Sequence, residues 1–377
     1  MSSCAEELFP GFSNGDFLCG FHAILELIAD AAYDNQNEIA MPFLLINIFH
    51  FIILTRKSMR ISSINVLIAA VAFADMCSFL YATEQILTKV LYIHNRCLFS
   101  GSYWKIVINL KLDALAKCAR KCSTWFSLFV VLIRTLVVRN PLNSFYQNLT
   151  NPPAAYKTIL GAILLFSPLF VVRSIERQVY VFKTTSICKP NQTFVSYGTM
   201  KNEDFLANDR LIMKIVEPVD SILSNIIPCI LFPIVTAFLV KEIWKFAKNQ
   251  QRIASSRKSF ESQKTTKMVL LFAVTYFISG FPLGIASALV PYYINGIPGI
   301  ESILYCFIYF FGSVVTLNTV THFFVCGIMS ADYRKTMLSV VRCGKEKSSL
   351  GVVVHLQVLW FHSDSSEAVI SIVWFGR

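Results

Sequence analysis

Charged residues are scarce in this sequence, and their scarcity excludes a water-soluble globular fold. Of the 377 residues 15% are charged and 55% are hydrophobic, and the apolar residues collect in several long runs. Soluble domains average about 25% charged residues. We therefore predict a polytopic membrane protein surrounded by lipid.

Basic residues are absent from the first 38 residues, which carry seven acids. Lysine and arginine favour the cytoplasmic side of a membrane, so this acidic segment is expected outside. It also lacks a basic stretch followed by an apolar core, so we expect no cleavable signal peptide and insertion through the first spanning helix. We predict an extracellular arm over residues 1–38, either irregular or with a short amphipathic helix at residues 21–32.

Patterns typical of other function classes are also missing. The six histidines are scattered without metal-ligand spacing, and the 11 cysteines form no disulfide framework for a chain of this size. We therefore predict neither a metal site nor an enzyme. The sequence shows no internal repeat of the kind that builds transporters and no filter-like loop of a channel. The basic residues behind the net charge of +11 lie mainly in the predicted loops and do not form one amphipathic helix face or one continuous tract. This distribution argues against a nucleic-acid partner.

Seven apolar runs predict an all-α membrane protein, a seven-transmembrane helix bundle over residues 39–328. A short amphipathic helix follows helix seven, within a cytoplasmic segment over residues 329–377. With seven spans, the basic residues after helices one, five and seven all fall on the same side of the membrane. The positive-inside rule requires this, so the count of seven agrees with the charges. The predicted spans are residues 39–55, 62–87, 155–172, 215–240, 268–290 and 302–327, together with helix three, whose apolar half covers residues 123–138.

One arginine, Arg134, lies in the otherwise uncharged stretch of residues 123–138 in the third predicted helix. An arginine at mid-bilayer costs roughly 2.5–3.5 kcal/mol, so such a residue tends to face the bundle interior and to mark function. The alternative is a side chain that carries its charge to the membrane surface. Pro141 follows Arg134 by seven residues.

The string CSTWFSLFVVLIRTLVVRNP, which ends at Pro141, resembles the end of the third helix in rhodopsin-like G-protein-coupled receptors. It is similar to the nematode serpentine receptors of class W, relatives of the FMRFamide-type peptide receptors. The resemblance extends helix three upward to about Trp104. The resemblance implies a plasma-membrane receptor that binds an extracellular ligand, first of all a neuropeptide. It also implies activation of a heterotrimeric G protein through Arg134 and Pro141. A chemosensory receptor for a small environmental molecule is the alternative, and a ligand-gated channel or a transporter comes after it.

The resemblance further implies a polar centre that can bind a sodium ion. The residues at its motif positions are Asn47, Asp75, Ser123 and Asn318. The simpler interpretation of Asn47, Ser123 and Asn318 is ordinary hydrogen bonding between helices. Asp75 needs more, because a buried carboxylate requires a cation, a partner or a proton.

The signatures of the rhodopsin-like pattern are incomplete. The acid expected before Arg134 is Ile133, and the helix-seven signature has lost its proline and its tyrosine, since the chain reads from Asn318 to His322 as NTVTH. We expect a weakened resting-state hold on Arg134 and some ligand-free activity. Pro228 in helix five and Pro282 in helix six remain as expected helix hinges.

Three charged residues at the start of helix three recur at steps of four and three, which places them on one helix face. They are Asp113, Lys117 and Arg120. Arg120 stands about 21 Å above Arg134 on a straight helix, below the surface of a ~30 Å hydrocarbon core. We hypothesise that the three form the floor of a ligand pocket. The alternative is a solvated face on a helix that projects from the membrane.

The resemblance implies a disulfide between Cys97, before helix three, and Cys188 in the long outer loop. Cys4, Cys19, Cys118 and Cys122 remain competing partners. The sequon at Asn191 falls in the same outer loop, where it can carry glycan.

Overall fold

The computed structural model describes residues 2–94, 102–140, 142–186, 189–251, 256–293 and 296–347. The helices are α1 (Ser2–Leu8), α2 (Gly15–Leu54), α3 (Ser63–His94), α4 (Tyr103–Arg139), α5 (Ser144–Asn148), α6 (Pro152–Ile175), α7 (Glu203–Ser221), α8 (Ile227–Gln251), α9 (Ser256–Tyr293), α10 (Pro298–Asn318), α11 (Thr321–Met329) and α12 (Ala331–Lys347). A π-helical turn joins α7 to α8, and one antiparallel hairpin follows α6. These elements are η1 (Ile222–Ile226), β1 (Arg177–Ser186) and β2 (Lys189–Lys201).

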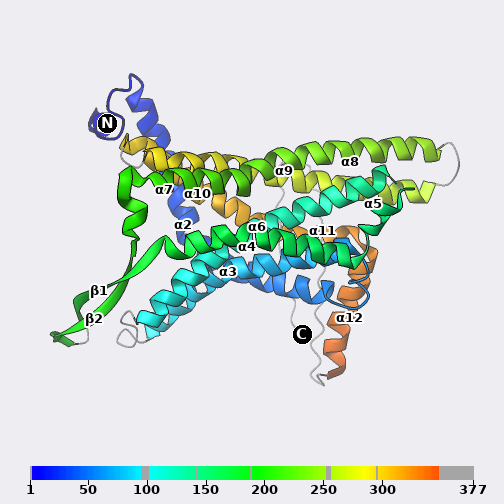
Figure 1. Cartoon of the computed structure of the whole chain (residues 1–377), viewed down its shortest axis with the longest axis horizontal. Helices are drawn as coiled ribbons and strands as arrows, with labels where there is room; N and C mark the ends of the chain where they lie inside the picture. The colour runs from blue at the N-terminus through cyan, green and yellow to red at the C-terminus, as the bar shows by residue number, and fades with distance from the viewer. Residues whose placement is uncertain are drawn as a thin grey trace, which may run out of the picture.

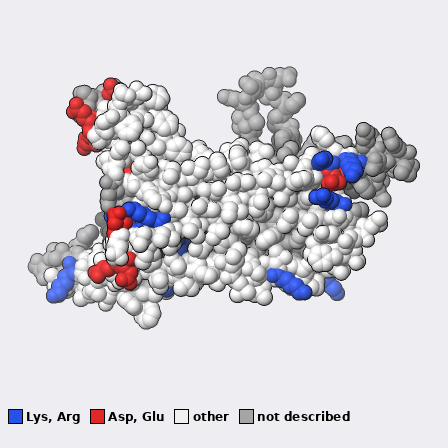
Figure 2. Space-filling view, turned by 45° about the horizontal axis from the view of Figure 1, so that its top comes forward, with Lys and Arg blue, Asp and Glu red and all other residues white. Residues whose placement is uncertain are grey.

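Seven helical segments among the described residues are long and apolar enough to cross a membrane. In chain order, spanning helices one to seven are α2, α3, α4, α6, the continuous α7–η1–α8 segment, α9, and α10 with α11. They run side by side as one bundle (Figure 1). Figure 2 shows lysine, arginine and carboxylate side chains mainly near the two ends of the visible face, with an uncharged band between them. The predicted seven-helix membrane bundle is confirmed.

The short helix after helix seven, α12, runs across the direction of the bundle (Figure 1). It is held by Tyr333, whose side chain is fully buried and whose hydroxyl lies 2.6 Å from Nδ1 of His50 on α2. The ends of α2, α8 and α11 that lead into basic segments lie at the same end of the bundle as α12 (Figure 1). The helix directions therefore agree with the charge-based topology.

The first spanning helix begins at Gly15, well before residue 39, where the membrane span was predicted to start. At 40 residues α2 is about 60 Å long, twice the ~30 Å hydrocarbon core. Its outer part continues because it packs against α10. The Tyr33 and Tyr309 rings lie 5.0 Å apart, and His22 Nε2 lies 2.7 Å from the Ser302 hydroxyl.

The amino terminus folds back onto this outer part of the bundle. A disulfide joins Cys4 in α1 to Cys19 in α2, so two of the competing cysteines pair with each other. Phe9, between the two helices, is buried against Gly299, where a Cβ atom would overlap the Phe9 ring. The predicted partners Cys97 and Cys188 lie outside the described residues, and that pairing stays a prediction.

The long outer loop contains a β-hairpin, which our sequence analysis did not predict. Strands β1 and β2 pair antiparallel from Arg177 opposite Lys201 to Ser186 opposite Lys189. Their sequences are rich in valine, threonine, tyrosine and phenylalanine, the composition that favours strands. Asn191 lies in β2, but its side chain is outside the described part of the structure.

The bundle core is organised around α4, which packs against α3, α6 and α8. Phe126 of α4 meets Phe166 of α6 in one buried cluster, and Leu128 of α4 meets Cys229 of α8 in another. Lipid is as apolar as these side chains, so close packing and polar contacts between helices hold such a bundle more than the hydrophobic effect does.

The fifth spanning helix is interrupted beside the predicted hinge Pro228. In η1 the hydrogen bonds shift by one residue, as in the bond from Ile227 N–H to the Ile222 carbonyl. Pro228 has no N–H to donate, so it leaves the carbonyl of Ser224 unpaired in an α-helical register and that of Leu223 unpaired in a π-helical one.

Side chains from two other helices hydrogen-bond these carbonyls. Trp125 of α4 donates its Nε1–H to the Leu223 oxygen at 3.0 Å, and the Tyr276 hydroxyl of α9 donates to the Ser224 oxygen at 3.3 Å. Backbone groups away from water need such partners. Pro282, the second predicted hinge, lies inside α9. Gly280, two residues earlier, brings α9 close to Cys229 of α8, since an added Cβ would lie 2.9 Å from its sulfur.

Trp125→Phe is expected to lower the thermal stability of the purified protein. The ring volume is largely kept, but the Leu223 carbonyl loses its donor in an apolar environment, a loss of roughly 1–3 kcal/mol. The measurement is thermal unfolding in detergent. Trp104→Phe, at a tryptophan that is 69% exposed, is the matched control and is expected to unfold like the wild type. Equal melting temperatures for both variants would show that the indole contributes no stabilising hydrogen bond.

Candidate ligand cavity and polar centre

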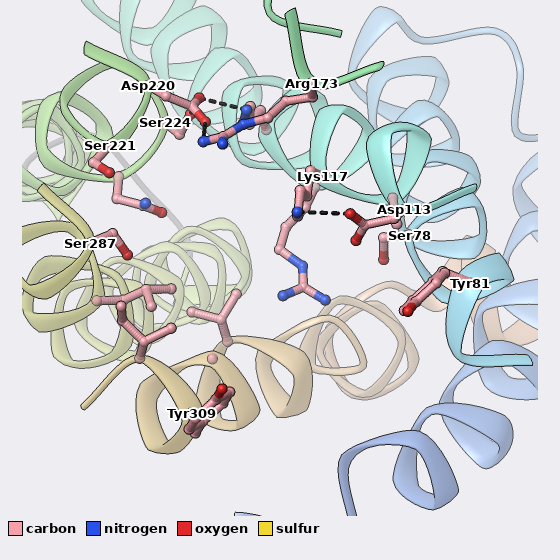
Figure 3. Close-up of a pocket in the computed structure, with 18 of the residues that line it drawn as sticks. Ser78, Tyr81, Asp113, Lys117, Arg173, Asp220, Ser221, Ser224, Ser287 and Tyr309 are labelled. Atoms are coloured by element: carbon pink, nitrogen blue, oxygen red, sulfur yellow. Dashed lines mark hydrogen bonds and ion pairs between the residues drawn. The ribbon is translucent and has the colours of Figure 1, made fainter. Parts of the chain in front are cut away.

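A cavity of about 570 Å³ opens between the helices at the end of the bundle that carries the β-hairpin. Its size falls in the range of about 300–1,000 Å³ that small-molecule sites occupy. Helices α2, α3, α4, α7, α9 and α10 contribute to its wall, together with Arg173 of α6 and Lys201 at the end of β2. Figure 3 shows labelled side chains from several of these helices around one central space.

The three residues predicted from the helix-three periodicity all line this cavity. Lys117 Nζ lies 2.8 Å from Asp113 Oδ2, and the two side chains point toward each other in Figure 3. Arg120 follows Asp113 by two helical turns, about 10 Å further along α4. The structure therefore brings the predicted face together on a cavity wall, and its contact with a ligand stays a prediction.

A cluster of five charged residues forms another part of the wall, and our sequence analysis did not identify it as a unit. We call it the outer ion cluster. Its members are Lys121 of α4, Arg173 of α6, Glu176 just after α6, and Glu217 and Asp220 of α7.

Arg173 is the centre of the outer ion cluster. Its guanidinium contacts Glu176 at 2.8 Å, Glu217 at 2.5 and 2.7 Å, and Asp220 at 2.6 Å. Lys121 Nζ lies 2.5 Å from the other oxygen of Asp220. The predicted fourth span ended at residue 172, but α6 continues through Ile175 and places Arg173 in its last helical turn.

The outer ion cluster is buried, which makes its pairing strong. The side chains of Lys121, Arg173 and Asp220 are 9%, 10% and 8% exposed. Burial alone would raise the pKa of the Glu176 carboxyl, but Arg173 beside it holds that pKa below its usual value. The sequence feature that could have indicated this cluster is the presence of charged residues at positions 121, 217 and 220 within apolar helices.

A second, smaller cavity of about 40 Å³ lies deeper in the bundle and contains most of the predicted polar centre. Asp75, Ser123 and Asn318 line it, and Arg120 and His322 complete its polar wall. The Ser123 hydroxyl interacts with the Asp75 carboxyl. The described structure therefore brings together three of the four predicted residues.

Asn47, the fourth predicted residue, does not line either cavity. It is fully buried in α2, where its Nδ2 donates to the Phe43 carbonyl at 3.0 Å. Its Oδ1 atom has no hydrogen-bond partner among the described residues.

Helix seven is broken at the degenerate signature even without a proline. Its two parts, α10 and α11, are separated at Thr319 and Val320. The hydroxyls of Thr319 and Thr321 donate to carbonyls of the preceding turn at 2.8 and 2.7 Å. Asn318 Oδ1 accepts from Thr275 of α9 at 3.0 Å, and His322 Nε2 lies 3.2 Å from the Ser127 hydroxyl of α4.

Arg134 lies near the opposite end of α4 from the ligand cavity. It forms no ion pair with any carboxylate that the structure describes, and its Nε–H is buried without a partner there. Ile133 packs among Val66, Leu67 and Ala155, so it cannot substitute for the missing acid. Pro141 lies outside the described residues.

Asp220→Asn is expected to lower stability sharply and to reduce surface expression. The change removes a partner of both Lys121 and Arg173, and breaking a buried pair typically costs about 3–5 kcal/mol. Asp209→Asn is the matched control, because Asp209 pairs with Lys214 but its side chain is 80% exposed. The measurements are surface labelling and thermal unfolding. If both variants behaved like the wild type, the outer ion cluster would have no structural role.

The comparisons with known proteins agree with this arrangement. A family model described as Serpentine type 7TM GPCR chemoreceptor Srw matches residues 34–344. No curated protein matches the chain. The matched region begins within α2 and ends within α12, and it includes the other six spanning segments and the lining of both cavities. This chain belongs to the Srw family of serpentine seven-transmembrane G-protein-coupled chemoreceptors.

Proposed function

We propose that this receptor acts at the plasma membrane, binds a neuropeptide in the larger cavity and activates a heterotrimeric G protein. The observation that carries the proposal is the construction of α4. One end of this helix presents Asp113, Lys117 and Arg120 to the cavity, and Arg134 lies near the other end without a described carboxylate partner. A change at the cavity can therefore reach the arginine through one continuous helix.

The orientation follows from the charges. The amino-terminal residues without lysine or arginine lie at the same end as the β-hairpin, and the basic segments lie at the other (Figure 1). The positive-inside rule makes the first end extracellular and the second cytoplasmic. The cavity then opens toward the outside, and Arg134 lies toward the G protein.

The chemistry of the cavity favours a ligand with an acidic group. Lys117 is paired with Asp113, and Lys121 and Arg173 are paired within the outer ion cluster. Arg120 has no ion pair with a described carboxylate, so its guanidinium is available to an anion. A peptide carboxylate or an acidic side chain forms two parallel hydrogen bonds with such a group.

One feature favours a peptide over a smaller ligand, and two others favour the smaller ligand. The β1–β2 hairpin is two-stranded, and its outer edges offer backbone groups that an extended peptide can pair with. The volume of about 570 Å³ also suits a small environmental molecule, and the chemoreceptor description of the family favours that second candidate. The screen described below separates the two.

Activation requires the inner ends of the helices to move. The interrupted fifth helix at η1 and Pro228, and Pro282 in the sixth, are places where bending costs least. Because no described carboxylate holds Arg134, the resting state is weakly locked. The receptor then exchanges nucleotide on its G protein to some extent without ligand.

Arg134→Ala is expected to abolish this ligand-free exchange while surface expression is kept. The measurement is guanine-nucleotide exchange on purified G proteins by receptor-containing membranes. Arg139→Ala, at an exposed arginine on the same helix, is the control and is expected to keep most of the activity. A whole-cell current in place of nucleotide exchange would support the channel alternative and contradict the proposal.

Arg120→Glu is expected to reduce agonist potency about a hundredfold, because a charge-assisted pair becomes a repulsion. Agonists are first identified by screening a neuropeptide library and a panel of small acids on cells that express the receptor. Arg177→Glu, at an exposed arginine of β1, is the control for charge alone. Unchanged potency and surface expression for Arg120→Glu would remove this residue from the binding site.

A further inference from the structure

Among the residues that the structure describes, Arg120 is the one charged residue that lines both cavities. The large cavity contains several other cations, but the small one contains Arg120 and the carboxylate Asp75 as its charged residues. Both side chains line this one space of about 40 Å³. One side chain of α4 therefore reaches both the proposed ligand site and the polar centre.

Asp75 needs positive charge nearby or a proton in this position. It is 2% exposed, and its Oδ2 atom has no hydrogen-bond partner among the described residues. The Ser123 hydroxyl supplies one interaction, but a hydroxyl cannot neutralise a carboxylate. An ionised carboxylate with an unsatisfied oxygen inside the membrane needs positive charge close by.

The residues around Asp75 do not fit the sodium ion that the sequence resemblance implies. A small hard cation takes oxygen ligands and is favoured by a negative local field. Here the guanidinium of Arg120 forms part of the wall of a space of about 40 Å³. A free cation in that space would be repelled by a fixed one at close range, in surroundings that screen charge weakly.

We propose that Arg120 supplies the resident positive charge for Asp75 across the small cavity, without a direct ion pair between the two, and takes the place of a sodium ion. The positive charge of the polar centre is then covalently part of α4 and does not exchange with the solvent. This charge does not depend on the sodium concentration of the solution. Arg120 then lies between the ligand cavity and the residues around Asp75.

This placement has a consequence that rests on the proposed function. An acidic ligand group that binds Arg120 from the large cavity competes with Asp75 for the same guanidinium. The hold on Asp75 weakens, and Ser123, Asn318 and His322 around the small cavity can rearrange. Ligand binding would in this way be coupled to the inner half of the bundle by one charged group.

The test uses the purified full-length receptor without ligand or G protein. Thermal unfolding is measured in sodium chloride and in N-methyl-D-glucamine chloride at equal ionic strength. The variants are Arg120→Gln, Asp75→Asn and the double variant, with Lys117→Gln as a control at another cavity cation. The wild type and Lys117→Gln are expected to melt at the same temperature in both salts.

Arg120→Gln is expected to melt lower and to gain a sodium-specific increase in melting temperature, because Asp75 has lost its counter-ion. The double variant is expected to lose that sodium response and to melt higher than the sum of the two single losses predicts. Recovery of expression in the double variant supports the pair even where a single variant fails to fold.

Two results would overturn the proposal. One is a sodium-specific stabilisation of the wild type that Asp75→Asn removes, since that shows a sodium site. The other is a strictly additive loss in the double variant, which shows that the two residues do not interact. Neither result bears on ligand binding or nucleotide exchange, so the proposed function is tested separately.

Discussion

A charge buried in a membrane needs a partner, and this constraint explains the arrangement around α4. Lys121 pairs with Asp220, which also binds Arg173, so charges from helices three, four and five join in one cluster. The cluster fixes the helices around the cavity at the end that carries the hairpin. At the other end Arg134 lacks a described carboxylate partner, and that is the region where we propose that the G protein binds. Paired charges thus hold one end of the helix, while the other remains able to change.

The same requirement applies to the backbone. Pro228 leaves carbonyls of helix five without their usual donors, and Trp125 and Tyr276 supply donors from helices three and six. In helix seven the hydroxyls of Thr319 and Thr321 donate to carbonyls beside the break. Breaks in the two helices are therefore stabilised by specific side chains. A helix break of this kind can bend without exposing unsatisfied polar groups to lipid.

The two cavities and Arg134 lie along one helix, which gives a physical route from ligand to signal. Arg120 reaches both cavities, and His322 at the second one contacts Ser127, further along α4 toward Arg134. Under the proposed function, a ligand that changes the position of Arg120 alters contacts near the middle of the bundle. The inner ends of helices five and six, with their hinges, can then respond.

From the amino-acid sequence alone we predicted the seven spans, the grouping of the basic segments at one end and the shared face of Asp113, Lys117 and Arg120, because hydropathy and helical periodicity are local properties. Partners distant in the chain required the tertiary structure. Lys121 and Asp220 are 99 positions apart, and no local pattern links them. The start of α2 was missed because packing on α10 accompanies its extension beyond the membrane. The position of Arg120 on the walls of both cavities was likewise decided by packing. The cavities that a side chain lines depend on the helices packed opposite it.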